Sequence, residues 1–128
     1  MVTPFGSLLR YFRNQRGIAL KALAAKIHIS PKVLYALESG IRRPPTGDDL
    51  LALSDALSLR PNEARALAEA AQDSVTTLRI PRAATAREYR LAHQLFRHLG
   101  RLSDEQIDGI ETLLKDRKLS AIPGGNMT

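Results

Sequence analysis

Apolar residues recur along the first 72 residues with the spacing of short amphipathic helices. The first stripe runs from Phe5 to Phe12 and follows Thr3-Pro4, a hydroxyl cap with a proline suited to a first helical turn. Gly17 is expected to end this helix. Four further stripes lie at residues 19–27, 31–39, 47–57 and 62–71. The pattern therefore predicts five short helices that form one compact all-α domain over residues 1–72.

Residues 73–84 interrupt this helical spacing. The stretch from Ser74 to Ile80 is rich in β-branched residues and precedes Pro81, which fits either an extended linker or a short strand. Beyond it, Thr85 caps a helix that runs to about residue 99, and Ser103 begins a capping box for another helix. The sequence thus predicts a C-terminal helical hairpin over residues 85–120, followed by a flexible tail over 121–128.

The positive charge is concentrated in the first third of the chain. The net charge is +6, but residues 1–45 alone hold eight Lys/Arg and one acidic residue, Glu38, a net of +7. Residues 46–72 hold two Arg and five acidic residues, a net of −3. Such asymmetry favours a polyanionic partner, and nucleic acid in particular.

Composition excludes several other classes of protein. There is no cysteine, which rules out disulfides and cysteine-zinc sites, and no apolar run approaches the ~18 residues of a membrane helix. The histidines, His28, His93 and His98, lack the spacing and carboxylates of a metal site. No nucleophile elbow or phosphate-binding glycine loop is present. We expect no metal, no cofactor and no enzymatic activity, and a cytoplasmic location.

The second and third predicted helices have the layout of a helix-turn-helix. Ala24 is small where two helices would cross closely, and His28 lies in the turn, where a left-handed backbone is usual. Ile29 and Leu34 supply the apolar contact beneath the turn. Any small helical bundle contains such corners, so this spacing alone leaves the function open.

The segment from Leu23 to Pro44 resembles the lambda-repressor-like family (Xre, or Cro/cI type). The resemblance rests on a small residue in the first helix, the Ile29-Ser30 turn, Glu38-Ser39-Gly40 and Arg42-Arg43-Pro44, and it extends from about residue 5 to about residue 71. There are two departures: Leu20 stands where the family often has a phosphate-binding glutamine, and His28 replaces the turn glycine.

The resemblance implies an all-α, five-helix DNA-binding domain and assigns roles to its residues. The implied base-reading residues are Pro31, Lys32, Val33 and Ala36. Of these only Lys32 is a strong donor, suited to guanine, so part of the specificity is expected from DNA shape. The DNA backbone is expected to contact Ser30, Tyr35, Ser39, Arg42, Arg43, Lys21 and Arg10. Arg13 and Glu38 are implied to form a structural ion pair.

The expected function is a dimeric, sequence-specific transcriptional repressor of its own or neighbouring promoters. Because one such domain covers half an operator, the C-terminal hairpin is expected to dimerise. The expected dimerisation residues are Tyr89, Leu95, Phe96, Leu99, Ile107, Ile110 and Leu114. Three alternatives remain: the hairpin packs on the first domain, the chain is an antitoxin-like autoregulator whose C-terminal helices bind a protein, or the bundle has lost DNA binding.

Overall fold

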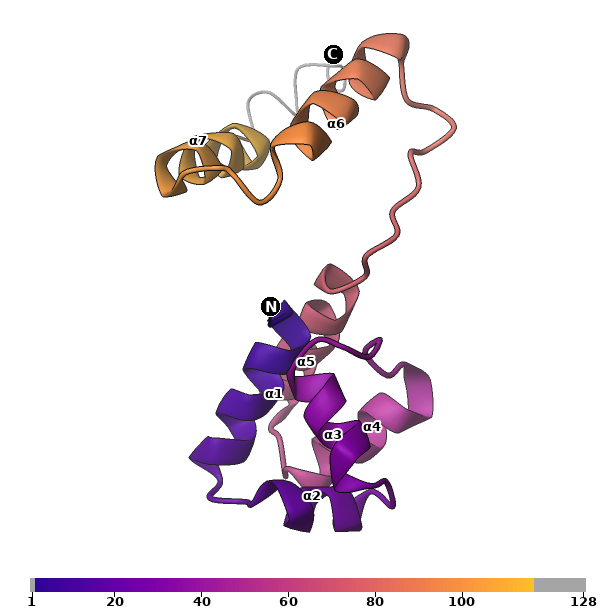
Figure 1. The fold of residues 1–128 in the computed structure, drawn as a ribbon, viewed down its shortest axis with the longest axis vertical. Helices are drawn as coiled ribbons and strands as arrows, with labels where there is room; N and C mark the ends of the chain where they lie inside the picture. The colour runs from indigo at the N-terminus through magenta and orange to yellow at the C-terminus, as the bar shows by residue number, and fades with distance from the viewer. Residues whose placement is uncertain (1, 117–128) are drawn as a thin grey trace. The chain divides into compact units, whose positions relative to one another are not determined.

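The computed structural model describes residues 2–116 and shows an all-α protein (Figure 1). Two compact units divide after Leu78. The first unit contains α1 (Pro4–Gln15), α2 (Leu20–Lys26), α3 (Pro31–Glu38), α4 (Gly47–Ala56) and α5 (Pro61–Asp73). The second contains α6 (Ala86–His98) and α7 (Asp104–Lys115). The predicted fold class, five helices followed by two more, is confirmed, and the described residues contain no strand.

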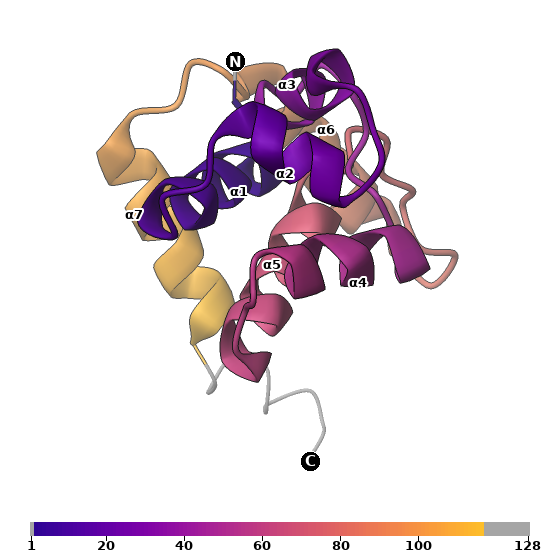
Figure 2. The same ribbon diagram turned by 90° about the horizontal axis from the view of Figure 1, so that it is seen from below.

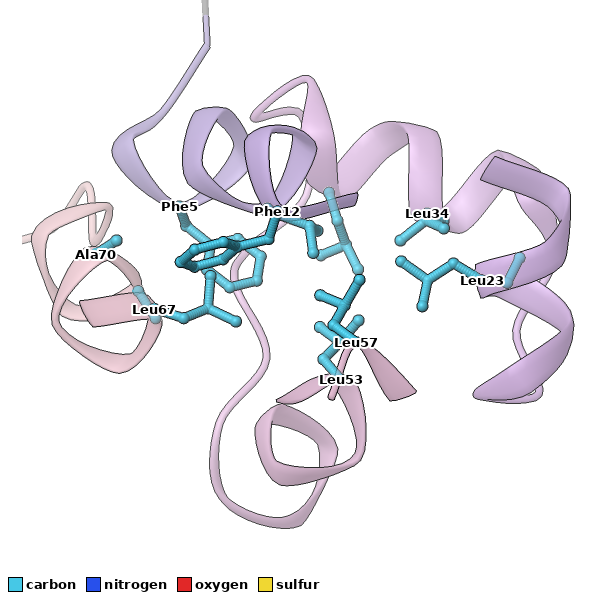
Figure 3. Packing of buried hydrophobic residues seen from close by; sticks show 12 residues of the cluster. Phe5, Phe12, Leu23, Leu34, Leu53, Leu57, Leu67 and Ala70 are labelled. Atoms are coloured by element: carbon cyan, nitrogen blue, oxygen red, sulfur yellow. The ribbon is translucent and has the colours of Figure 1, made fainter. Parts of the chain in front are cut away.

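The core of the first unit is built from side chains of all five of its helices. In Figure 3, Phe5 and Phe12 of α1 lie next to Leu67 of α5, and Leu23 of α2 faces Leu34 of α3. Each of these five residues is at most 5% exposed. Burying a side chain of this size stabilises the fold by about 1.5–3 kcal/mol. The core therefore holds α2 and α3 in a fixed orientation.

Four consecutive helices of this unit end in the same way. After α1, α2, α3 and α4, a residue with positive φ is followed by one whose N–H donates to a carbonyl five residues earlier, as in Ile29 N to Ala24 O at 3.0 Å. The positive-φ residues are Gly17, His28, Gly40 and Ser58. His28, at φ 59°, adopts the left-handed backbone that the sequence predicted, whereas Ser58, at φ 53°, was not expected there.

Ser74 joins the end of α5 to the start of α1. The N–H of Phe5 donates to Ser74 Oγ at 2.8 Å, and that hydroxyl donates to the carbonyl of Ala70 at 2.7 Å. Ser74 is buried, so it is part of the first unit, although the sequence placed the domain end at residue 72. Residues 75–84 contain neither helix nor strand.

The second unit consists of two well-capped helices with little interior. Thr85 with Glu88, and Ser103 with Gln106, form the predicted capping boxes of α6 and α7. Figure 2 shows the two helices joined by a short turn, and neither contains a buried residue. The sequence placed Leu114 inward, but it is 77% exposed because two helices alone do not enclose a core. Within residues 2–116 no helix is long and apolar enough to cross a membrane.

Candidate nucleic-acid interface

The corner between α2 and α3 has the geometry of a helix-turn-helix. Ala24 is fully buried, so the two helices approach closely at this small residue. The turn spans residues 27–30, and the Ser30 hydroxyl caps α3 by accepting from the N–H of Val33 at 3.2 Å. Pro31 occupies the first turn of α3, as the sequence predicted. Both the start and the direction of α3 are thus fixed by local hydrogen bonds and by the core.

One face of α3 packs into the domain and the other is open. Leu34, Leu37 and Glu38 are buried. Pro31, Lys32 and Tyr35 are exposed; Tyr35, at 57%, shows how open this side is. By helical spacing these three residues share one side of the first turns. α3 therefore presents a free surface at its N-terminal half.

The remaining residues predicted to contact DNA on α3 are only partly accessible. Val33 is half-buried and packs against the hydrophobic core. Ala36 is half-buried, and its carbonyl accepts hydrogen bonds from the N–H groups of Ile41 and Arg42. Ser39, at the C-cap, is also half-buried. The free surface of α3 thus depends chiefly on Lys32 and Tyr35.

Four basic side chains around this surface have no acidic partner within residues 2–116. Lys21 lies in the first turn of α2, Lys32 in the first turn of α3, and Arg42 and Arg43 in the loop after α3. All four are exposed. None of them forms a salt bridge with a described residue. Their charge is therefore available to an external anion.

The one acidic residue of the first 45 is neutralised inside the domain. Glu38 is 1% exposed, and its carboxylate accepts from Arg13 Nε at 2.6 Å and Arg13 Nη2 at 3.1 Å. Arg13 also donates to the carbonyl of Ile18 at 3.0 Å. The hydrogen bond to Glu38 raises the pKa of Arg13 above its usual value. The pair implied by the resemblance is present, and it ties the end of α3 to α1.

Arg10 also faces Glu38, a contact that the sequence did not suggest. Its Nε lies 3.3 Å from Glu38 Oε1, and its side chain is 41% exposed. The sequence assigned Arg10 to the DNA backbone. In the structure its charge is shared with the buried carboxylate, so it is less available to a phosphate than Lys21 or Arg42.

A second ion pair, between Arg16 and Glu63, was not predicted from the sequence. Arg16 Nη2 lies 2.6 Å from Glu63 Oε1, and Arg16 Nε donates to the carbonyl of Leu57 at 3.0 Å. The hydrogen bond from Arg16, with that from the Arg60 N–H, lowers the pKa of Glu63 to about 2. This pair ties the end of α1 to the start of α5. Its members are 47 residues apart, and no local motif links them.

The described residues contain no group of three or more His, Cys, Asp or Glu side chains that could hold a metal ion. Of the three histidines of the sequence, His28 lies in the α2–α3 turn, and His93 and His98 lie on α6.

Comparison with known proteins identifies the family of the first unit. The helix-turn-helix family model matches residues 9–63, a range that begins within α1 and ends within α5. No curated protein and no solved structure matches the chain. The matched range contains the α2–α3 corner, Glu38 and all four of the exposed cations described above. The matching model is that of the lambda-repressor-like (Xre-type) helix-turn-helix family of DNA-binding transcription regulators, and residues 9–63 of the chain are similar to it.

Proposed function

We propose that the chain is a sequence-specific repressor that places the N-terminal half of α3 in the major groove of a two-fold symmetric operator. The observation that carries the proposal is the open side of α3, with Lys32 at its leading end and unpaired cations on both sides. A B-DNA major groove admits an α-helix, and flanking cations contact the phosphates on its two edges.

Lys32 is the main base-reading residue in this proposal. Its ammonium group donates to guanine O6 or N7, the acceptors that the major groove presents at a G·C pair. Val33 and Ala36 offer only the exposed part of apolar side chains, which fits contact with a thymine methyl. Such sparse direct contacts leave the rest of the specificity to the shape and deformability of the operator.

The phosphate contacts fall to the exposed donors beside α3. Arg42, Arg43 and Lys21 carry free charges, and Tyr35 offers a hydroxyl from the same side of α3. The Ser30 hydroxyl already accepts from Val33 N, and Arg10 shares its charge with Glu38. Both residues therefore contribute less than the sequence suggested.

Repression follows from occupancy of a promoter by two copies of the chain. One domain covers half an operator, so two copies are needed for a specific site. The proposed activity takes place on bacterial nucleoid DNA in the cytoplasm and needs no catalytic residue, cofactor or metal. The exposed apolar side chains of α6 and α7 also fit an antitoxin-like autoregulator, whose second unit binds a different protein.

The direct test begins with selection of bound fragments from random double-stranded DNA. Gel shifts on the selected site and on random DNA then compare the wild type with Lys32→Ala and Arg43→Ala. We expect Lys32→Ala to lose about 1–3 kcal/mol of discrimination at one base pair per half-site, with binding to random DNA little changed. We expect Arg43→Ala to weaken binding to both DNAs alike and to reduce the salt slope by about one unit.

The two variants serve as matched controls, because each removes one positive charge from the same surface. Equal losses on selected and random DNA for Lys32→Ala would show that this residue reads no base. Failure of the wild type to shift any DNA at low salt would contradict the proposal as a whole and favour a bundle that binds only protein.

A further inference from the structure

The second unit exposes more apolar surface than two helices can cover. Phe96 of α6 is 65% exposed, and Leu113 and Leu114 of α7 are 63% and 77% exposed. Between α6 and α7 lies an open groove of about 480 Å³, lined by Leu91, Leu95 and other residues of both helices. Exposed apolar surface on this scale is typical of a site of protein association.

The two helices carry opposite charges. The segment from Thr85 to Ser103 holds four arginines against one acidic residue, Glu88. The α7 helix holds four acidic residues against one basic residue, Lys115. The arginines are Arg87, Arg90, Arg97 and Arg101, and the acidic residues are Asp104, Glu105, Asp108 and Glu111. Among the described residues no salt bridge joins the two sets.

We infer that this face binds a second copy of the chain, with the basic α6 of each copy packed along the acidic α7 of the other. The inference rests on the proposed two-copy function and specifies its interface. A two-fold interface is self-complementary, so each contact between α6 and the partner's α7 occurs twice. The four helices together enclose the apolar side chains that one copy leaves exposed.

The charges favour this pairing over an arrangement in which each helix packs against the same helix of the other copy. Packing α6 against the partner's α6 would bring together the three arginines of this helix from each copy, and packing α7 against α7 would bring together the four acidic residues of each copy. Charges that flank the apolar seam of a helical bundle set partner choice and orientation in this way. The second copy itself supplies the complementary charge, so no other protein is needed.

The first experiment measures the mass of the full-length, DNA-free protein by analytical ultracentrifugation. We expect a dimer for the wild type and a monomer for Phe96→Asp and for Leu114→Asp. Both residues are largely exposed in the single chain, so these substitutions leave its own packing intact. A monomeric wild type, or variants that remain dimers, would overturn the inference.

The second experiment tests the pairing by exchange of charge. One variant carries Arg87→Glu and Arg97→Glu in α6, and another carries Glu105→Lys and Glu111→Lys in α7. In each variant the two substituted residues lie in different turns of their helix. Each variant alone should associate at least about tenfold more weakly than the wild type, because its contacts become repulsive.

Combination of the changes should restore association. A mixture of the two variants should form heterodimers, since every α6–α7 contact then joins opposite charges. One chain carrying all four changes should form homodimers for the same reason. No rescue in either case would contradict pairing of α6 with the partner's α7. Arg79→Glu with Arg82→Glu, outside both helices, is the charge-matched control and should leave the dimer intact.

The outcomes separate this inference from the proposed function. If Lys32→Ala remains a dimer but loses base discrimination, both stand. If the wild type is monomeric yet shifts its selected site, DNA reading stands and the interface is wrong. A dimer that binds no DNA would support the interface and contradict the proposed function.

Discussion

Glu38 is a buried carboxylate whose charge is balanced by arginines from α1. Arg13 contributes two hydrogen bonds to it and Arg10 a third, longer one. Moving such a charge from water into the protein interior costs several kcal/mol, and the hydrogen bonds from the two arginines offset this cost. The pair between Arg13 and Glu38 joins the end of α3 to α1.

Removal of the carboxylate should therefore be costly. Glu38→Ala leaves Arg13, whose side chain is only 14% exposed, without its partner. We expect the free energy of unfolding to fall by about 3–5 kcal/mol, measured by urea denaturation. Arg10→Ala, which removes a 41% exposed partner, is the control and should cost at most about 1 kcal/mol. Similar small losses for both variants would show that the pair contributes little.

The ion pair between Arg16 and Glu63 gives the domain a defined response to acid. The pKa of Glu63 is about 2 in the folded chain, below its ordinary value of 4.5. The lower folded-state pKa means that this stabilisation is fully present above pH 4.5 and is lost as the pH falls towards 2. Thermal unfolding between pH 6 and 2 should show a shallower acid loss for Glu63→Gln than for the wild type. Glu69→Gln, exposed on the same helix, should keep the wild-type slope.

Ser58 and Gly17 allow a paired test of the left-handed helix ends. Ser58 has φ 53° and is exposed, so Ser58→Gly removes backbone strain and should raise the free energy of unfolding by about 1 kcal/mol. Gly17 has φ 63° with no atom near its missing Cβ, so Gly17→Ala should lower it by about 1–2 kcal/mol. Opposite signs in denaturant titrations are expected. Changes of the same sign would contradict the account of these turns.

At the scale of the helices, the sequence predicted most of what local patterns control. Caps and prolines at Thr3-Pro4 and Ser30-Pro31 marked the starts of α1 and α3, and His28 marked the turn between α2 and α3. The contact of Arg10 with Glu38 and the pairing of Arg16 with Glu63 were not predictable. They depend on how α1 crosses other helices, and no local spacing encodes that crossing.

Gly6 is the point at which α1 crosses the end of α3. A Cβ at this position would overlap the carbonyl oxygen of Glu38 and lie 2.9 Å from that of Leu37. Because both obstacles are backbone atoms, Gly6→Ala must push the two helices apart. We expect a loss of about 1–3 kcal/mol in the free energy of unfolding, with weaker operator binding as α3 shifts. Ser7→Ala, the exposed neighbour, is the control and should change neither; an unchanged Gly6→Ala would disprove the close crossing.

At the scale of the whole molecule, the two units divide the proposed work. The first has a complete core and carries the open face of α3, while the second has no buried residue in its helices. The sequence predicted both units from helical spacing. It did not show which side chains of α6 and α7 remain exposed, because exposure depends on how many helices share a core.

The contact between Lys32 and a base is the central claim, and methylation interference on the selected operator tests it most directly. Methylation of guanine N7 in the major groove should block wild-type binding at one position in each half-site, the two positions about one helical turn apart or a multiple of it. Lys32→Ala should lose sensitivity at those guanines alone and keep every other interference. An unchanged pattern for Lys32→Ala would contradict the placement of α3 in the groove.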